Sequence, residues 1–210
     1  MTSPVIKKTL NLHKYSIRVS DFIANWKIII PIVFSVAGMI LGCMDGKGEG
    51  RLFLKITSVI SEAVLKIDAV PLTAFLRYLL PPTALAVILF FLGMSAYGGF
   101  AVNFIPLGFS FAAGAFSYYM YDSYTLKGLA YCVMLVFPYA VMSLTALVLC
   151  CAESINMSEL MLKSISDSRK FSDYSFRKYY IAYLKNYLLI IFASAAGTAL
   201  THLFGGLFSF

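Results

Sequence analysis

Five long stretches of this chain contain no Lys, Arg, Asp or Glu. They take up about half of its 210 residues and cover 28–44, 79–102, 104–121, 128–152 and 187–210. A helix of roughly 18 or more apolar residues is long enough to cross about 30 Å of hydrocarbon. We therefore expect about five transmembrane helices, with the lipid bilayer as the main solvent of the chain.

The composition supports the same class of protein. Hydrophobic residues make up 60% of the chain and charged residues 13%, whereas a typical soluble domain is about 25% charged. Backbone groups in lipid must be hydrogen-bonded within the protein, so a spanning chain forms helices or a closed barrel. The stretches lack the alternation of apolar and polar residues that marks barrel strands. The predicted fold is therefore all-α, a polytopic membrane helical bundle that forms a single integral domain, residues 1–210.

The basic residues predict how the chain is oriented. Residues 1–27 and 153–186 together contain eleven Lys and Arg, whereas 45–78 and 122–127 contain six. Because cytoplasmic segments collect Lys and Arg, we expect the tail 1–27 and the loop 153–186 in the cytoplasm. An odd number of spans then places the C-terminus outside the cytoplasm. These flanks account for the net charge of +7, and nucleic acid is not an expected partner because there is no separate basic domain.

Two polar segments are expected to add helices outside the membrane. In the outer loop 45–78, the apolar residues of 51–70 recur at helical spacing, which predicts an amphipathic helix that ends before Pro71. This helix lies either on the outer membrane surface or against the bundle. In the loop 153–186, tyrosines alternate with bases, which predicts an interfacial cytoplasmic helix that contacts anionic lipid. Pro81-Pro82 is expected to open the second span, because proline suits the first helical turn.

Small residues predict where helices approach each other closely. Gly38 and Gly42 form a GxxxG pattern in the first span, and the third span contains Gly108, Ala112 and Gly114. Such residues permit near backbone-to-backbone packing of membrane helices. We expect all of them to be helix-packing positions, and we expect the third span to lie at the centre of the bundle.

The spans carry few groups that could perform chemistry. Among His, Lys, Arg, Asp and Glu they contain only His202, although pumps and intramembrane enzymes generally keep ionisable residues inside. We expect Asn103 to cap the third span and Pro138 to kink the fourth. Metalloprotease, nucleotide-binding and nucleophile-elbow motifs are missing. Small-hydrophobe behaviour is expected of the four cysteines, Cys43, Cys132, Cys150 and Cys151. We therefore expect no enzyme activity, no catalytic residue, no cofactor and no metal.

Three short motifs stand in a fixed order in the central part of the chain. Residues 91–98 are Phe-Leu-Gly-Met-Ser-Ala-Tyr-Gly, 106–110 are Pro-Leu-Gly-Phe-Ser, and 124–128 are Tyr-Thr-Leu-Lys-Gly, with Pro138 ten residues further on. Because of this pattern, the segment from about residue 90 to 155 resembles the stage II sporulation protein M family of endospore-forming bacteria. In that family, the turn that corresponds to 124–128 reads tyrosine-glycine-leucine-lysine-glycine. Thr125 replaces the first glycine of that turn. Pro81-Pro82-Thr83 stands where family members often carry an asparagine pair.

The resemblance implies a non-catalytic membrane scaffold that recruits peptidoglycan-remodelling enzymes during spore engulfment. The implied partners are a lytic transglycosylase and an amidase-endopeptidase, and self-association is also open. Such partners would reach the outer loop, the 122–127 turn and the exported C-terminus. The contact residues that we expect are Arg51, Lys55, Glu62, Lys66, Asp122, Tyr124 and Lys127. For the turn, the alternative is that these residues only close the loop and anchor it at the interface.

Two other functions stay open at this point. A permease-like subunit of a transporter would bind a cytoplasmic ATPase through the 153–186 loop. The Gly-rich third span favours this alternative, because helices interrupted by Gly and Pro mark many transporter sites. An intramembrane enzyme is the third hypothesis. Association with peptidoglycan hydrolases or with an ATPase would separate the first two.

Overall fold

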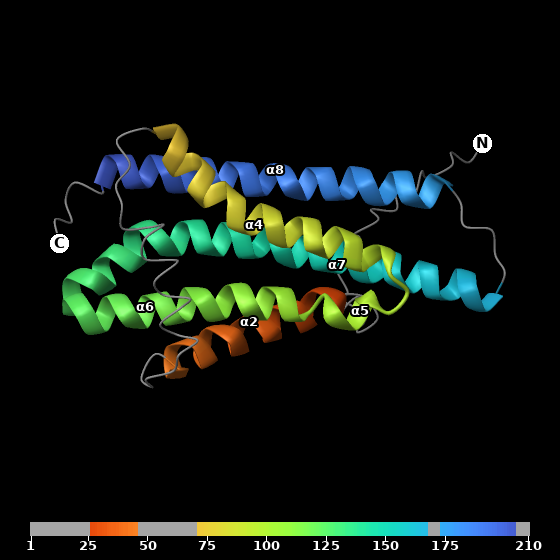
Figure 1. Cartoon of the computed structure of the whole chain (residues 1–210), viewed down its shortest axis with the longest axis horizontal. Coiled ribbons are helices and arrows are strands. Elements are labelled where there is room, and N and C mark those ends of the chain that lie inside the picture. The colour runs from red at the N-terminus through yellow and green to blue at the C-terminus, as the bar shows by residue number, and fades with distance from the viewer. Residues whose placement is uncertain (1–25, 46–70, 168–172, 205–210) are drawn as a thin grey trace, which may run out of the picture.

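The protein is a bundle of helices (Figure 1). A computed structural model describes residues 26–45, 71–167 and 173–204, and every secondary-structure element in these ranges is helical. The elements are α2 (Trp26–Asp45), α4 (Pro71–Met94), α5 (Gly98–Ala101), α6 (Phe104–Tyr131), the π-helical turn η1 (Cys132–Val136), α7 (Phe137–Asp167) and α8 (Asp173–Phe204). Within the described residues, four stretches are long and apolar enough to cross a membrane. The predicted class, a helical membrane bundle, is confirmed.

The longest apolar stretch, Gly98–Ser164, has 67 residues and turns back on itself. Its turn lies at Thr125, where φ is 52° and ψ is −129°. Phe116 before the turn packs in one buried cluster with Leu135 after it. The stretch is thus an antiparallel hairpin (Figure 1), in which α6 up to the turn is one arm, and the end of α6, η1 and α7 form the other.

Helix α7 lies at the centre of the described bundle, between α4 and α8 on one side and α2 and α6 on the other (Figure 1). Its residues Leu147, Cys150 and Ile155 belong to a buried cluster that α4 and α8 complete. Helix α6 packs chiefly along α2. The prediction that 104–121 occupies the centre is therefore wrong, because the small residues of α6 accept a single close neighbour whereas α7 has buried residues facing several helices.

The outward faces of the helices are strongly apolar. Val36 on α2 is 56% exposed, Phe91 on α4 is 66% exposed and Phe192 on α8 is 63% exposed. In water, contiguous surfaces of this kind promote aggregation. The distribution of exposed apolar side chains therefore supports a lipid bilayer as the environment of the bundle.

Helix α4 starts earlier than predicted and continues through two prolines. It begins at Pro71 rather than at residue 79, and Pro81 and Pro82 lie in its interior. Pro82 has no N–H to bond the carbonyl of Tyr78, four residues before it. The Tyr139 hydroxyl of α7 donates to that carbonyl instead, at 2.7 Å. Packing against α7 thus compensates for a helical bond that the α4 sequence cannot make.

The loop expected over 153–186 is mostly a continuation of two long helices. Helix α7 continues to Asp167, and α8 begins at Asp173. Helix α7 thus continues past residue 152, where the fourth span was predicted to end, and the prediction of an interfacial helix separate from the fifth span is wrong because both belong to α8. The physical reason is burial: Ile155 and Met157, 3% and 1% exposed, belong to the same core as the preceding turns of α7.

The irregularity expected at Pro138 takes the form of a π-helical turn. Turn η1 covers Cys132–Val136, directly before the proline. A proline in a helix lacks one donor, and its ring clashes with the carbonyl four residues earlier, here that of Met134. The local change from α- to π-helical bonding in front of Pro138 is consistent with both effects.

Candidate functional site

The bundle has two distinct ends, which we name by what they carry. The basic end holds Trp26, the helix α5 and the adjoining ends of α7 and α8, and lies on the right in Figure 1. The turn end holds Asp45, Pro71, the Thr125 turn and Phe204. Consecutive long helices therefore run between the same two ends, and each end gathers residues that are far apart in the sequence.

One serine of α7 holds the connection between α4 and α6 at the basic end. The Ser158 hydroxyl lies 2.8 Å from the Ser95 carbonyl and 3.2 Å from the Ala96 carbonyl. It also accepts a bond from the Gly99 N–H at 3.0 Å. Ser158 is itself 2% exposed. It bonds to partly buried backbone groups of the α4–α5 connection, where the regular helical bonding is interrupted.

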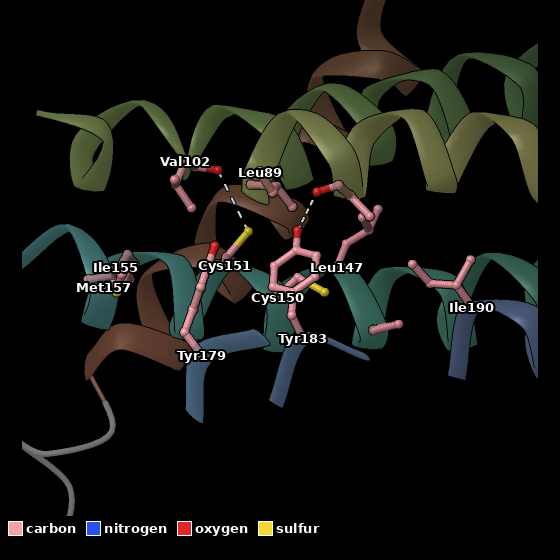
Figure 2. Packing of buried hydrophobic residues seen from close by; sticks show 12 residues of the cluster. Leu89, Val102, Leu147, Cys150, Cys151, Ile155, Met157, Tyr179, Tyr183 and Ile190 are labelled. Atoms are coloured by element: carbon pink, nitrogen blue, oxygen red, sulfur yellow. Dashed lines mark hydrogen bonds between the residues drawn. The ribbon is translucent and has the colours of Figure 1, made fainter. Parts of the chain in front are cut away.

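Two tyrosines of α8 reach across to the backbone of α4 (Figure 2). Tyr179 donates to the Phe90 carbonyl at 3.2 Å. Tyr183 donates to the Ala86 carbonyl, a bond that Figure 2 shows as a dashed line. The Tyr179 ring stacks on Phe90 with 5.2 Å between centroids. Each ring thus fills apolar space while its hydroxyl finds a partner, as buried tyrosines generally do.

Two smaller side chains of α7 also bond to backbone carbonyls of the neighbouring elements. Ser154 donates to the Leu89 carbonyl at 3.0 Å. Cys151 points its Sγ at the Val102 carbonyl, 3.7 Å away (Figure 2). A Cβ on Gly93 would collide with Ser154, so that glycine permits the close approach of α4 and α7.

Sequence reasoning missed this set of hydroxyl groups. The signal was available, since Ser154 and Ser158, and likewise Tyr179 and Tyr183, are spaced four residues apart on one helical face. These residues position helices; none of the partners described is a side chain arranged for acid–base or nucleophilic chemistry.

An ion pair at the basic end ties α2 to α7. Lys27 donates to Glu159 Oε2 at 2.7 Å and to Asn156 Oδ1 at 2.8 Å. Its ammonium also lies 5.8 Å from the centre of the Trp26 ring. The Lys27 and Glu159 side chains are 18% and 36% exposed, so the pair is worth about 0–1 kcal/mol. Its main effect is to fix which segments meet at this end.

The turn end carries the predicted contact residues that the structure describes. Asp122 and Lys127 are exposed and Tyr124 is half-buried. Leu126 between them is 75% exposed. The turn therefore presents one acidic, one basic and one large apolar side chain to its surroundings. The remaining predicted contacts lie outside the described residues: Arg51, Lys55, Glu62 and Lys66. The same is true of the predicted amphipathic helix 51–70.

The predicted packing glycines divide into two groups. A Cβ on Gly38 would overlap the Leu107 carbonyl, and one on Gly114 would overlap the Met39 carbonyl, so both lie at the contact of α2 with α6. Gly42 faces the backbone of α6 in the same way. At Gly108 there is open space instead. Half-buried Ala112 lies one turn further along α6.

Asn103 occupies the first position before α6 without capping it through its side chain. Its Nδ2 donates backwards to the carbonyls of Gly99 and Phe100, at 3.2 and 3.4 Å. Its Oδ1 has no partner among the described residues, and the residue is 7% exposed. The prediction of a side-chain cap is therefore wrong, because the tight α5 turn places nearer carbonyls within reach of the amide.

The described residues hold no group of three His, Cys, Asp or Glu that could bind a metal ion. Cys132, Cys150 and Cys151 are buried as free thiols, and Cys43 is half-buried. His202 is exposed near the end of α8. Comparison of the chain with protein-family models, curated proteins and solved structures finds no match.

Proposed function

We propose that this protein is a non-catalytic membrane scaffold that crosses the bilayer several times. The observation that supports this proposal is the use of its interior polar groups. The hydroxyls of Ser154, Ser158, Tyr179 and Tyr183 all bond to main-chain carbonyls of the α4–α5 region. Buried hydroxyl groups that bond to the backbone of a neighbouring helix hold the two helices together. Such a use of the interior polar groups is expected of a protein that presents surfaces to partners and does not itself catalyse a reaction.

The proposed orientation places the basic end in the cytoplasm and the turn end outside. The distribution of Lys and Arg supports this choice. Residues 1–27 and 153–186 contain eleven Lys and Arg, whereas 45–78 and 122–127 contain six. Because short cytoplasmic segments collect Lys and Arg, the N-terminus would be cytoplasmic and the C-terminus extracytoplasmic.

The partners we propose are peptidoglycan hydrolases of the kind that act in spore engulfment, a lytic transglycosylase and an amidase-endopeptidase. This part of the proposal comes from the resemblance of the central motifs to the stage II sporulation protein M family. The exposed turn around Leu126 is the described surface that such enzymes would contact in the proposed orientation, with Asp122, Tyr124 and Lys127 beside it.

Site-specific photo-crosslinking in native membranes tests this proposal. A photoreactive residue at Leu126 is expected to yield adducts with peptidoglycan hydrolases. Its matched control is the same residue at Leu160, which is 46% exposed at the basic end and is expected to yield none. Absence of hydrolase adducts from position 126, or their equal appearance from position 160, would contradict the scaffold proposal.

A transporter subunit is the second candidate, and one observation favours it. Turn η1 interrupts the α-helical bonding within the second arm of the hairpin, directly before Pro138. Interrupted helices occur at many transporter sites, and the ends of α7 and α8 at the basic end offer a surface to a cytoplasmic ATPase. Adducts between an ATPase and position 160 would support the transporter subunit and contradict the scaffold proposal.

A further inference from the structure

One stripe of α8 near the basic end combines exposed bases with exposed apolar side chains. Lys178, Ile181, Lys185, Leu188 and Phe192 follow one another at intervals of three or four residues, and all five are exposed. Residues with this spacing lie along one side of a helix. We call this stripe the outer face of α8.

The opposite side of α8 is occupied by the bundle. Tyr179, Tyr183 and Ile190 are 4%, 7% and 0% exposed and pack against α4 and α7. The outer face therefore points away from the described helices. Neither Lys178 nor Lys185 forms an ion pair with another described residue, since the single such pair joins Lys27 to Glu159.

We propose that the outer face of α8 binds the headgroups of anionic phospholipids. The lysines would contact phosphate, and Ile181 and Leu188 would contact the upper part of the acyl chains. Lys178 and Lys185 are two turns apart, about 10 Å along the axis at 1.5 Å per residue. The side chain of a lysine is long and flexible, and its methylene groups can lie along an apolar surface. Both ammonium groups can therefore reach the same layer of lipid headgroups.

The neighbouring residues support this depth in the membrane. Tyr180 is 53% exposed beside the stripe, and tyrosine concentrates at the membrane–water interface. Beyond Leu188 the outer face becomes wholly apolar at Phe192.

Lipid fits this face better than either protein occupant. A second copy in a two-fold contact would bring the same patch of each copy together and so place Lys178 and Lys185 near their own counterparts. Like charges brought together across an interface oppose association. A soluble acidic protein would match the lysines but would leave the adjoining Leu188 and Phe192 without a partner. An anionic phospholipid supplies both chemistries in one molecule.

Quenching by brominated lipids tests the proposal on the whole chain. Trp26→Phe with Tyr180→Trp leaves a single tryptophan beside the outer face. This protein is reconstituted into vesicles that mix phosphatidylglycerol and phosphatidylcholine, with either one brominated. We expect phosphatidylglycerol to be preferred about three-fold or more at the reporter, since each lysine near an anionic surface contributes favourably. Lys178→Gln with Lys185→Gln should reduce this preference to about one.

Two further variants separate the site from general charge effects. Lys127→Gln, at the turn end, removes a charge far from the reporter and should leave the preference unchanged. Lys178→Arg with Lys185→Arg keeps both charges and should retain it. An equal preference in the parent and in the double Gln variant would overturn the proposal. A reporter that neither brominated lipid quenches would also overturn it, because protein would then cover this face.

Discussion

At the scale of single residues, Thr125 has the most strained backbone among the residues that the structure describes. It is the one described non-glycine residue with positive φ, at 52°. A β-branched side chain is rarely found there, and such a conformation costs of the order of 1–3 kcal/mol. Thr125→Gly should therefore stabilise the protein by about 1 kcal/mol, after allowing for the larger entropy of glycine in the unfolded chain. Thermal unfolding in detergent measures this change in stability. Thr125→Ala should gain less, and a lower melting temperature for Thr125→Gly would refute the assignment of strain.

Ser158 and Ser110 form a second comparison between single residues. Both are buried, at 2% and 4% exposure, but Ser158 bonds to three backbone groups and Ser110 Oγ has no partner among the described residues. Ser158→Ala should destabilise the fold by about 0.5–1.5 kcal/mol, because it removes hydrogen bonds to partly buried backbone groups of the α4–α5 connection. Ser110→Ala should be neutral or stabilising. Denaturation in mixed micelles measures both changes, and an equal loss in the two variants would show that Ser158 does not hold the α4–α5 connection.

At the scale of helices, the contact between α2 and α6 depends on glycine. Gly38→Ala would drive its methyl group into the Leu107 carbonyl, and overpacking of this kind costs about 1–3 kcal/mol. Gly108 lies on α6, the other helix of this contact, and a Cβ there meets open space. Gly108→Ala should therefore be neutral or stabilising by about 0.5–1 kcal/mol, because glycine in a helix interior is less favourable than alanine. Thermal unfolding distinguishes the pair. If both substitutions lower the melting temperature alike, close packing at Gly38 is not the cause.

At the scale of the whole molecule, the two ends of the α6–α7 hairpin should lie on opposite sides of the membrane. Ser123 at the turn end and Lys163 at the basic end are both exposed. With an impermeant maleimide on intact cells, Ser123→Cys should be labelled and Lys163→Cys should react only after permeabilisation. The unmodified chain gives the background, since its cysteines are buried or half-buried. Labelling of both positions from the same side would rule out the proposed topology.

The sequence predicted the exposed residues of the turn, but it did not predict the polar contacts that hold the basic end together. The exposure of Asp122 and Lys127 follows from their place in a short charged turn between apolar segments, and the structure has both exposed. The role of Ser158 was not predicted, because a serine in an apolar run does not reveal which distant backbone it will meet. Its partners, the Ser95 and Ala96 carbonyls, lie more than sixty residues away in the chain.

The sequence by itself determined that the protein is made of long helices suited to lipid. Apolar length is a property of each segment alone, and backbone groups in hydrocarbon leave few alternatives to a helix. Only the tertiary structure decided which helix is central, and that α4 continues through Pro82. The Tyr139 hydroxyl that bonds to the Tyr78 carbonyl comes from another helix. Complementarity between distant side chains and backbone settles such choices, and local propensity does not contain that information.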